Sequence, residues 1–118
     1  MTATHHRPGP RMSEAVRVGE IVFLAGQIPE DLAAGIKVQT RQVLDAIDKV
    51  MADLGGSKSD VVSVQVWLAD MADFQGMNAV WDAWVDPGTP PARATCGVAL
   101  ARPGMRVEMV AVASLAER

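Results

Sequence analysis

Several features that would point to a function are scarce or absent in this sequence. It contains no tyrosine, and its one cysteine, Cys96, has no partner for an internal disulfide. Its 11 Lys and Arg are outnumbered by 14 Asp and Glu, so the net charge of -3 offers no basic surface for nucleic-acid phosphates. No apolar run is long enough to span a membrane, and residues 1–7 lack the apolar core of a signal peptide. We therefore expect a cytoplasmic protein with no nucleic-acid and no membrane partner.

The length and composition are those of one small folded domain. The chain has 118 residues, of which 49% are hydrophobic and 21% charged. We expect a single domain over 1–118, with residues 1–11 as a loose N-terminal arm. His5 and His6 in this arm are expected to be solvated rather than to bind metal. Because the core relies on small Ala and Val side chains, an oligomer interface would add much of the buried area.

Hydrophobic periodicity and turn residues predict the order β-β-α-β-α-β-β. The expected strands are 13–18, 21–25, 61–68, 92–100 and 105–114, and the expected helices are 32–54 and one that begins at Asp70. This order favours an α+β fold with one mixed sheet and both helices on one face. The uncovered face then needs a partner, which again favours an oligomer.

The strand expected at 61–68 predicts which side chains lie on that uncovered face. Val62, Val64, Val66 and Leu68 would form its apolar face, and Val61, Ser63, Gln65 and Trp67 would alternate with them. The second group of four side chains is too apolar for a face that contacts only solvent. We expect it to meet another subunit or to line a cleft.

Two charged residues, Arg93 and Glu108, lie inside short apolar stretches that read as strands. Charges are rarely buried unless they are paired or bound to a ligand. The planar fork of an arginine matches a carboxylate with two parallel hydrogen bonds. The sequence therefore predicts a site for a small anionic molecule. The alternative is a structural ion pair between Arg93 and Glu108 across an interface.

Six segments of the chain resemble the RidA (YjgF-type) family of reactive-intermediate imine deaminases. In order along nearly the whole chain, they are 24–29, 39–44, 68–74, 77–81, 91–95 and 107–111. The resemblance implies a chorismate-mutase-like fold and a homotrimer with a central barrel and ligand sites in the clefts between subunits. It also implies hydrolysis of small 2-imino or enamino acids to 2-keto acids and ammonia, without metal or organic cofactor.

The same resemblance assigns roles to individual residues. Arg93 matches the arginine that clamps the substrate carboxylate, and Glu108 matches the glutamate that positions or activates water. Gly26 matches a glycine whose backbone faces the ligand, and Asn78 matches an asparagine near the site. Thr95 is placed to supply a hydroxyl or a backbone N–H.

Three positions depart from the pattern of the best-studied members. Ala25 stands where they have serine, Thr95 stands where they have cysteine, and their N-terminal tyrosine is missing, with Met12 or a neighbour in its place. Cys96 lies one residue after Thr95, so on a strand it should point away from Arg93 and into the core. Arg106 shares strand parity with Glu108, but we expect it, like the other arginines, to lie on the surface rather than in the cleft.

These observations leave two main hypotheses from different classes. The first is an enzyme in which Arg93 holds the carboxylate of an imino acid and Glu108 handles water and a proton. The second, favoured by Ala25 and Thr95, is a non-catalytic trimer that binds or senses small carboxylate metabolites. Ribonuclease activity, a third possibility linked to the family, conflicts with the acidic charge balance.

Overall fold

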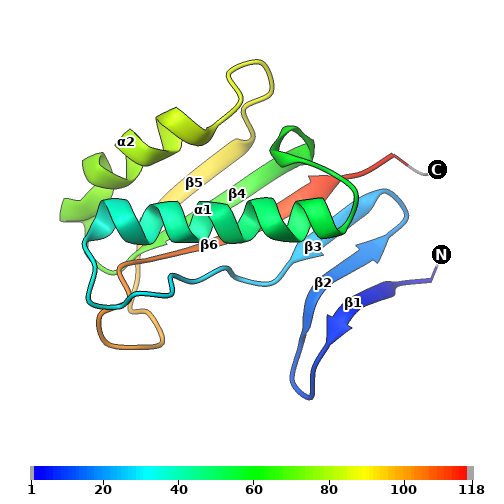
Figure 1. Ribbon diagram of the computed structural model, residues 1–118, viewed down its shortest axis with the longest axis horizontal. Coiled ribbons are helices and arrows are strands. Elements are labelled where there is room, and N and C mark those ends of the chain that lie inside the picture. Colours follow the sequence, from blue (N-terminus) through cyan, green and yellow to red (C-terminus); the bar gives the residue numbers. More distant parts are fainter. Residues whose placement is uncertain (1, 117–118) are drawn as a thin grey trace.

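The structure is a computed structural model that describes residues 2–116. One six-stranded sheet has the order β1-β2-β3-β6-β4-β5, and both helices cover the same face of it (Figure 1). The strands are β1 (Thr4–Pro8), β2 (Ser13–Val18), β3 (Ile21–Leu24), β4 (Val61–Leu68), β5 (Ala92–Gly97) and β6 (Val107–Ser114); the helices are α1 (Ile36–Asp53) and α2 (Phe74–Trp84). Only β4 and β5 pair in parallel, so the sheet is mixed and the predicted α+β architecture is confirmed.

The N-terminal segment corrects the predicted order by one strand. Residues 1–11 were expected to be a loose arm, but β1 pairs antiparallel with β2, so Thr4 lies opposite Arg17 and His6 opposite Ala15. Its side chains are mostly exposed and polar, so the segment has no apolar alternation from which a strand would be predicted. Arg7, which has a positive φ of 48°, pairs with Asp53 at the end of α1.

The helix α1 packs one face against the sheet and contributes to the core. It begins at Ile36 rather than at 32, because 31–34 form a turn in which the Ala34 N–H donates to the Asp31 carbonyl. It ends before Gly55, whose φ of +82° is costly for residues with a Cβ. One apolar stripe packs against the sheet, and its fully buried members include Val43, Leu44, Ile47, Val50 and Met51.

A buried glutamine in α1 fixes the start of β6. The Gln39 side chain donates to the carbonyls of Ala34 (3.1 Å) and Gly104 (2.8 Å) and accepts from the Arg106 N–H (2.8 Å). All its polar atoms are therefore satisfied, as burial requires. These bonds tie the loop before β6 to the helix layer and set where β6 enters the sheet.

The helix α2 begins later than the sequence predicts, because a short 3₁₀ turn follows Asp70. Asp70 accepts from the Ala72 N–H (2.9 Å), as expected of a cap. It caps the short 3₁₀ turn η2 (Met71–Asp73), however, and α2 proper starts at Phe74. Met77, Val80, Trp81 and Trp84 form its buried face.

A β-bulge changes the predicted faces of β4 at its first residues. The register against β6 slips between Val61 and Ser63, so Val61 is buried and Val62 is 45% exposed. The expectation that Val62 belongs to the apolar face is therefore wrong, since one extra residue reverses the alternation. After the bulge the prediction holds: Val64, Val66 and Leu68 face the helices.

The face of the sheet away from the helices is uncovered in the single chain. It carries several apolar side chains, among which Phe23 is 51% exposed, and the outer residues of β6 are only partly buried. Such a face is typical of a surface that a partner covers. Among residues 2–116, no helix is long and apolar enough to cross a membrane.

Candidate functional site: a free arginine and a carboxyl group on opposite faces

The strand β5 places Arg93 on the helix-covered face of the sheet. In the parallel pairing of β5 with β4, Arg93 lies opposite Val64, which is 1% exposed and faces the helices. Because β5 is the last strand of the sheet, its far side has no neighbouring strand. Arg93 therefore lies at the edge of the chain, half-buried beneath α2.

Aromatic and sulfur groups, rather than a carboxylate, surround the guanidinium of Arg93. Its Cζ lies 5.0 Å from the ring centroid of Trp81 and 6.0 Å from that of Phe74. Its Nη1 lies 3.9 Å from the sulfur of Met77. Among residues 2–116, no Asp or Glu lies within ion-pair distance of Arg93. The cation–π contacts hold the charge and leave the guanidinium donors that do not point at the Met77 sulfur for another group.

Two buried polar oxygens on the same side of the sheet also lack partners. Thr95 is two residues after Arg93 on β5 and therefore projects to the same face, and its Oγ1 has no hydrogen bond. Asn78 follows Met77 on α2, and its Oδ1 is likewise unsatisfied. A buried polar atom without a partner is costly. Within residues 2–116, the Arg93 guanidinium has no carboxylate partner, and Thr95 Oγ1 and Asn78 Oδ1 have no hydrogen-bond partner.

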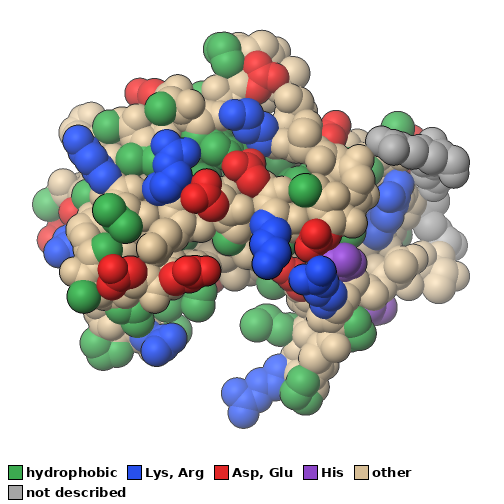
Figure 2. All heavy atoms as spheres, in the orientation of Figure 1, with side chains coloured by type: hydrophobic (Ala, Val, Ile, Leu, Met, Phe, Trp, Pro, Cys, Tyr) green, Lys and Arg blue, Asp and Glu red, His purple; other side chains and the backbone are tan. Residues whose placement is uncertain are grey.

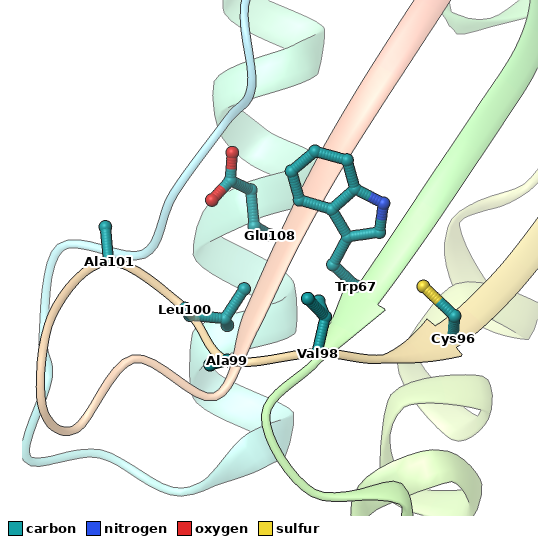
Figure 3. A pocket seen from close by; sticks show the side chains of 7 residues that line it. All are labelled: Trp67, Cys96, Val98, Ala99, Leu100, Ala101 and Glu108. Atoms are coloured by element: carbon teal, nitrogen blue, oxygen red, sulfur yellow. The ribbon is translucent and has the colours of Figure 1, made fainter.

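Glu108 lies on the opposite, uncovered face. It alternates with buried Val107 and Met109 along β6 and lies opposite Trp67 of β4. Burial raises the pKa of the Glu108 carboxyl above its ordinary value. In Figure 3 the Glu108 and Trp67 side chains project side by side from this face, and the loop 98–101 runs beneath them.

The Glu108 carboxyl occupies the space that the missing side chain of Gly26 leaves free. A Cβ added at Gly26 would collide with Oε2 of Glu108. The backbone next to Gly26 is held against β6 by a pair of hydrogen bonds between Gln27 and Met109, at 2.8 and 3.1 Å. Ala25 precedes it, and its carbonyl accepts from the Gln27 side chain at 2.8 Å. Gly26 and Ala25 thus accompany Glu108, and not Arg93.

The predicted site residues therefore fall into two sets on opposite faces of the sheet. Arg93, Thr95 and Asn78 form the helix-side set, and Glu108, Gly26 and Ala25 form the open-side set. Arg93 and Glu108 make no ion pair within the described chain. The structure places each set on one face of the sheet, but it does not bring the two sets together within one copy.

One further expectation needs correction, and another is met. Cys96 points away from Arg93, as predicted, but it is exposed rather than in the core, because β5 is not covered on the open face. Arg106 does not join Glu108, as expected: it precedes the first residue of β6, and its exposed guanidinium pairs with Asp73 at 3.2 Å. The described residues contain no group of three or more His, Cys, Asp and Glu placed to hold a metal ion.

The residues that hold Arg93 were missed as functional residues. The sequence places Phe74, Met77 and Trp81 on the apolar stripe of one helix and indicates a core role for all three. Their position over Arg93 depends on how α2 packs against β5, and no signal in the sequence specifies that packing. Trp67 was better anticipated, since its mixed strand face was expected to line a cleft or meet a subunit.

The sequence profile of the family described as Endoribonuclease L-PSP matches residues 4–115. The chain belongs to this family. It is 40% identical to a RutC family protein of Haemophilus influenzae over 97% of this chain and 99% of that protein. It is 37% identical to the RutC family protein YoaB of Escherichia coli, over 89% of this chain and 91% of that protein.

Solved structures of family members share the fold. A YjgF family protein from Neisseria meningitidis superposes with a TM-score of 0.94 at 40% identity, covering 100% of this chain and 98% of that one. RidA from an Antarctic Psychrobacter gives a TM-score of 0.83 at 34% identity, covering 92% and 93%. The resemblance to the RidA and YjgF proteins that the six sequence segments predict is confirmed.

Proposed function

We propose that this chain hydrolyses 2-imino acids to 2-keto acids and ammonia. The observation that carries the proposal is the half-buried Arg93 guanidinium, which rests on Trp81 and has no carboxylate partner in the described chain. A 2-imino acid has the carboxylate that this guanidinium lacks. The unsatisfied oxygens of Thr95 and Asn78 lie on the same side and suit the remaining polar atoms of such a ligand.

The two sets of residues form one site when a second copy supplies the other set. We propose a homotrimer in which the helix-side set of one chain faces the open-side set of its neighbour. The apolar open face and the free edge at β5 support this arrangement, because each is left without a partner in one copy. The RidA and YjgF relatives support the same arrangement through their shared fold.

The chemistry follows from these placements. Arg93 binds the carboxylate of the imino acid with two parallel hydrogen bonds. Glu108 takes a proton from a water molecule as the water oxygen attacks C2, and the π electrons of the C=N bond move to nitrogen. Glu108 then returns the proton to that nitrogen, which gives a carbinolamine. The hydroxyl proton next passes through Glu108 to the same nitrogen as the C–N bond breaks, so that the keto group forms and ammonia leaves. The products are one 2-keto acid and one ammonia.

The raised pKa of Glu108 suits this double role. A carboxyl whose pKa lies closer to neutrality accepts a proton from water more readily than an ordinary glutamate does. Imines hydrolyse readily in water, so a site with one base and one carboxylate clamp is sufficient. No metal or organic cofactor takes part in the proposed steps.

A second candidate function is non-catalytic binding of small carboxylates by the same site. Ala25 and Thr95 favour it, because both replace side chains that carry reactive or hydrogen-bonding groups in the best-studied relatives. RNA cleavage, which the family description names, is less well supported. On the face in Figure 2, Lys and Arg are interspersed with Asp and Glu and form no continuous basic patch.

Ammonia release tests the proposal directly. Imino acids generated in situ by an amino-acid oxidase should lose ammonia faster when the protein is present. Arg93→Ala should abolish the acceleration, whereas Arg41→Ala, an exposed arginine on α1, should leave it unchanged. If 2-keto acids raise the melting temperature of the wild type and no imino acid is turned over, the binding module is the correct function. An Arg93→Ala variant as active as the wild type would contradict a site built on Arg93.

A further inference from the structure

The open face contains a cavity next to Glu108 that the proposed reaction does not use. Its volume is about 530 Å³, which is within the usual range for small-molecule sites. It is lined by Trp67, Cys96, Val98, Ala99, Leu100, Ala101 and Glu108. Figure 3 shows Trp67 and Glu108 on one side of it and the loop 98–101 on the other.

The walls of this cavity are apolar except at one point. Glu108 is the only charged residue among those that line it, and the others offer an indole ring, aliphatic groups and one thiol. The same lack of polar surroundings raises the Glu108 pKa by desolvation. A group bound beside Glu108 therefore meets hydrocarbon on its other sides.

We infer that this cavity receives the side chain of the substrate, and that the substrates are 2-imino acids with medium or large apolar side chains. The inference rests on the proposed function, which places C2 of the substrate beside Glu108. From C2, a side chain that leaves the polar groups of the site enters the space between Trp67 and Leu100. An acidic side chain finds no cation there and meets the Glu108 carboxylate. A three-carbon imino acid leaves the cavity empty and gains none of its apolar contact.

Trp67 is the specificity-determining residue in this arrangement. Its ring forms the largest apolar wall of the cavity and stands next to Glu108 (Figure 3). Trp67 projects from β4 away from the core and is only partly buried, so its replacement leaves the packing between helices and sheet intact. Leu100 provides an independent position, because it lies in the loop after β5 rather than in the sheet.

The experiment compares kcat/KM for imino acids generated from leucine, phenylalanine, alanine and aspartate by suitable amino-acid oxidases. The wild type should prefer the leucine- and phenylalanine-derived substrates. Trp67→Ala should lower their kcat/KM about tenfold to hundredfold relative to the alanine-derived substrate, and Trp67→Phe should retain most of the preference. Leu100→Ser should shift the ratio in the same direction. Val62→Ala, on the exposed side of β4 but outside the cavity, should leave the ratio unchanged.

The outcomes separate this inference from the proposed function. If no imino acid is hydrolysed, the proposed function fails and the inference fails with it. If all four substrates are hydrolysed equally, or if Trp67→Ala and Leu100→Ser leave the ratio unchanged, only the inference on the cavity is overturned. A change in oligomeric mass in Trp67→Ala, with an unaltered substrate ratio in Leu100→Ser, would mean that another copy of the chain fills the cavity.

Discussion

The two faces of the sheet carry ionisable groups of opposite charge in different surroundings. On the helix-covered face, a permanent cation, Arg93, is stabilised by the ring of Trp81 at 5.0 Å, and two nearby oxygens remain without partners. On the open face, a carboxyl, Glu108, stands beside Gly26 in apolar surroundings that raise its pKa. The first face is suited to hold an anion, and the second to accept and return a proton.

This difference explains why one copy of the chain does not form the whole site. Residues on opposite faces are separated by the thickness of the sheet, and no side chain reaches around it from β6, which is an inner strand. Arg93, however, lies on the edge strand β5, where an adjoining chain has access. In the proposed mechanism, each face therefore provides one function, and contact between two copies would join them.

The largest expected effect concerns the anion-binding face. Arg93→Lys keeps the positive charge but loses the planar fork, so it should weaken the binding of 2-keto acids about a hundredfold. Calorimetric titration of pyruvate and 2-oxobutanoate measures this loss. Arg41→Lys serves as the control for an exposed arginine. Equal affinities of Arg93→Lys and the wild type would mean that the guanidinium does not contact the ligand.

The proton-transfer face should affect turnover rather than binding. Glu108→Gln should lower kcat about a hundredfold, because a neutral amide does not accept a proton from water. In the wild type the active form is the ionised carboxylate, so kcat/KM should rise with pH through the raised pKa of Glu108 and then level off. In Glu108→Gln this rise should disappear. A pH profile that Glu108→Gln does not change would assign the titration to another group.

A smaller effect is expected from crowding the carboxyl. Gly26→Ala adds a methyl group that collides with the Glu108 carboxylate, and the resulting displacement should lower kcat about tenfold. Gly35→Ala is a matched control, because nothing lies within 4 Å of a Cβ at that position. Steady-state kinetics of both variants would measure the effect. Equal kcat values would show that the contact between Gly26 and Glu108 has no role in turnover.

The smallest effect concerns the ring that holds Arg93. Trp81→Leu removes the cation–π contact and should raise KM about fivefold with little change in kcat, and Trp81→Phe should restore most of the affinity. Trp84→Phe is the control: it alters a neighbouring ring of α2 that contacts Lys58 instead. A fall in kcat at constant KM in Trp81→Leu would contradict a role in positioning Arg93.

The sequence predicts the periodicity within one helix or strand better than the packing or pairing between two of them. The period of α1, the faces of β4 after the bulge and the orientation of Cys96 relative to Arg93 all follow from alternation within a single element. The resemblance supplied the overall fold. The strand β1 was missed because its exposed, polar residues carry no apolar pattern, and its pairing with β2 is a tertiary event.

The candidate site was predicted residue by residue, but its division between two faces was not. The relative phase of Arg93 and Glu108 depends on the register of β5 against β4 and of β4 against β6. A loop from 98 to 106 separates the two strands in sequence, and alternation does not carry through such a loop. The contact between Trp81 and Arg93 depends on the packing of α2, which sequence periodicity does not specify either.

The central claim, that Arg93 of one copy acts with Glu108 of another, is tested most directly by mixing two inactive variants. Arg93→Ala and Glu108→Gln, co-expressed or refolded together in equal amounts, should form mixed oligomers. Some interfaces then receive an intact Arg93 from one chain and an intact Glu108 from the other. Random mixing in a ring predicts recovery of about a quarter of wild-type activity. If mixed oligomers form but recover no activity, both residues must act from the same chain, and the account is contradicted.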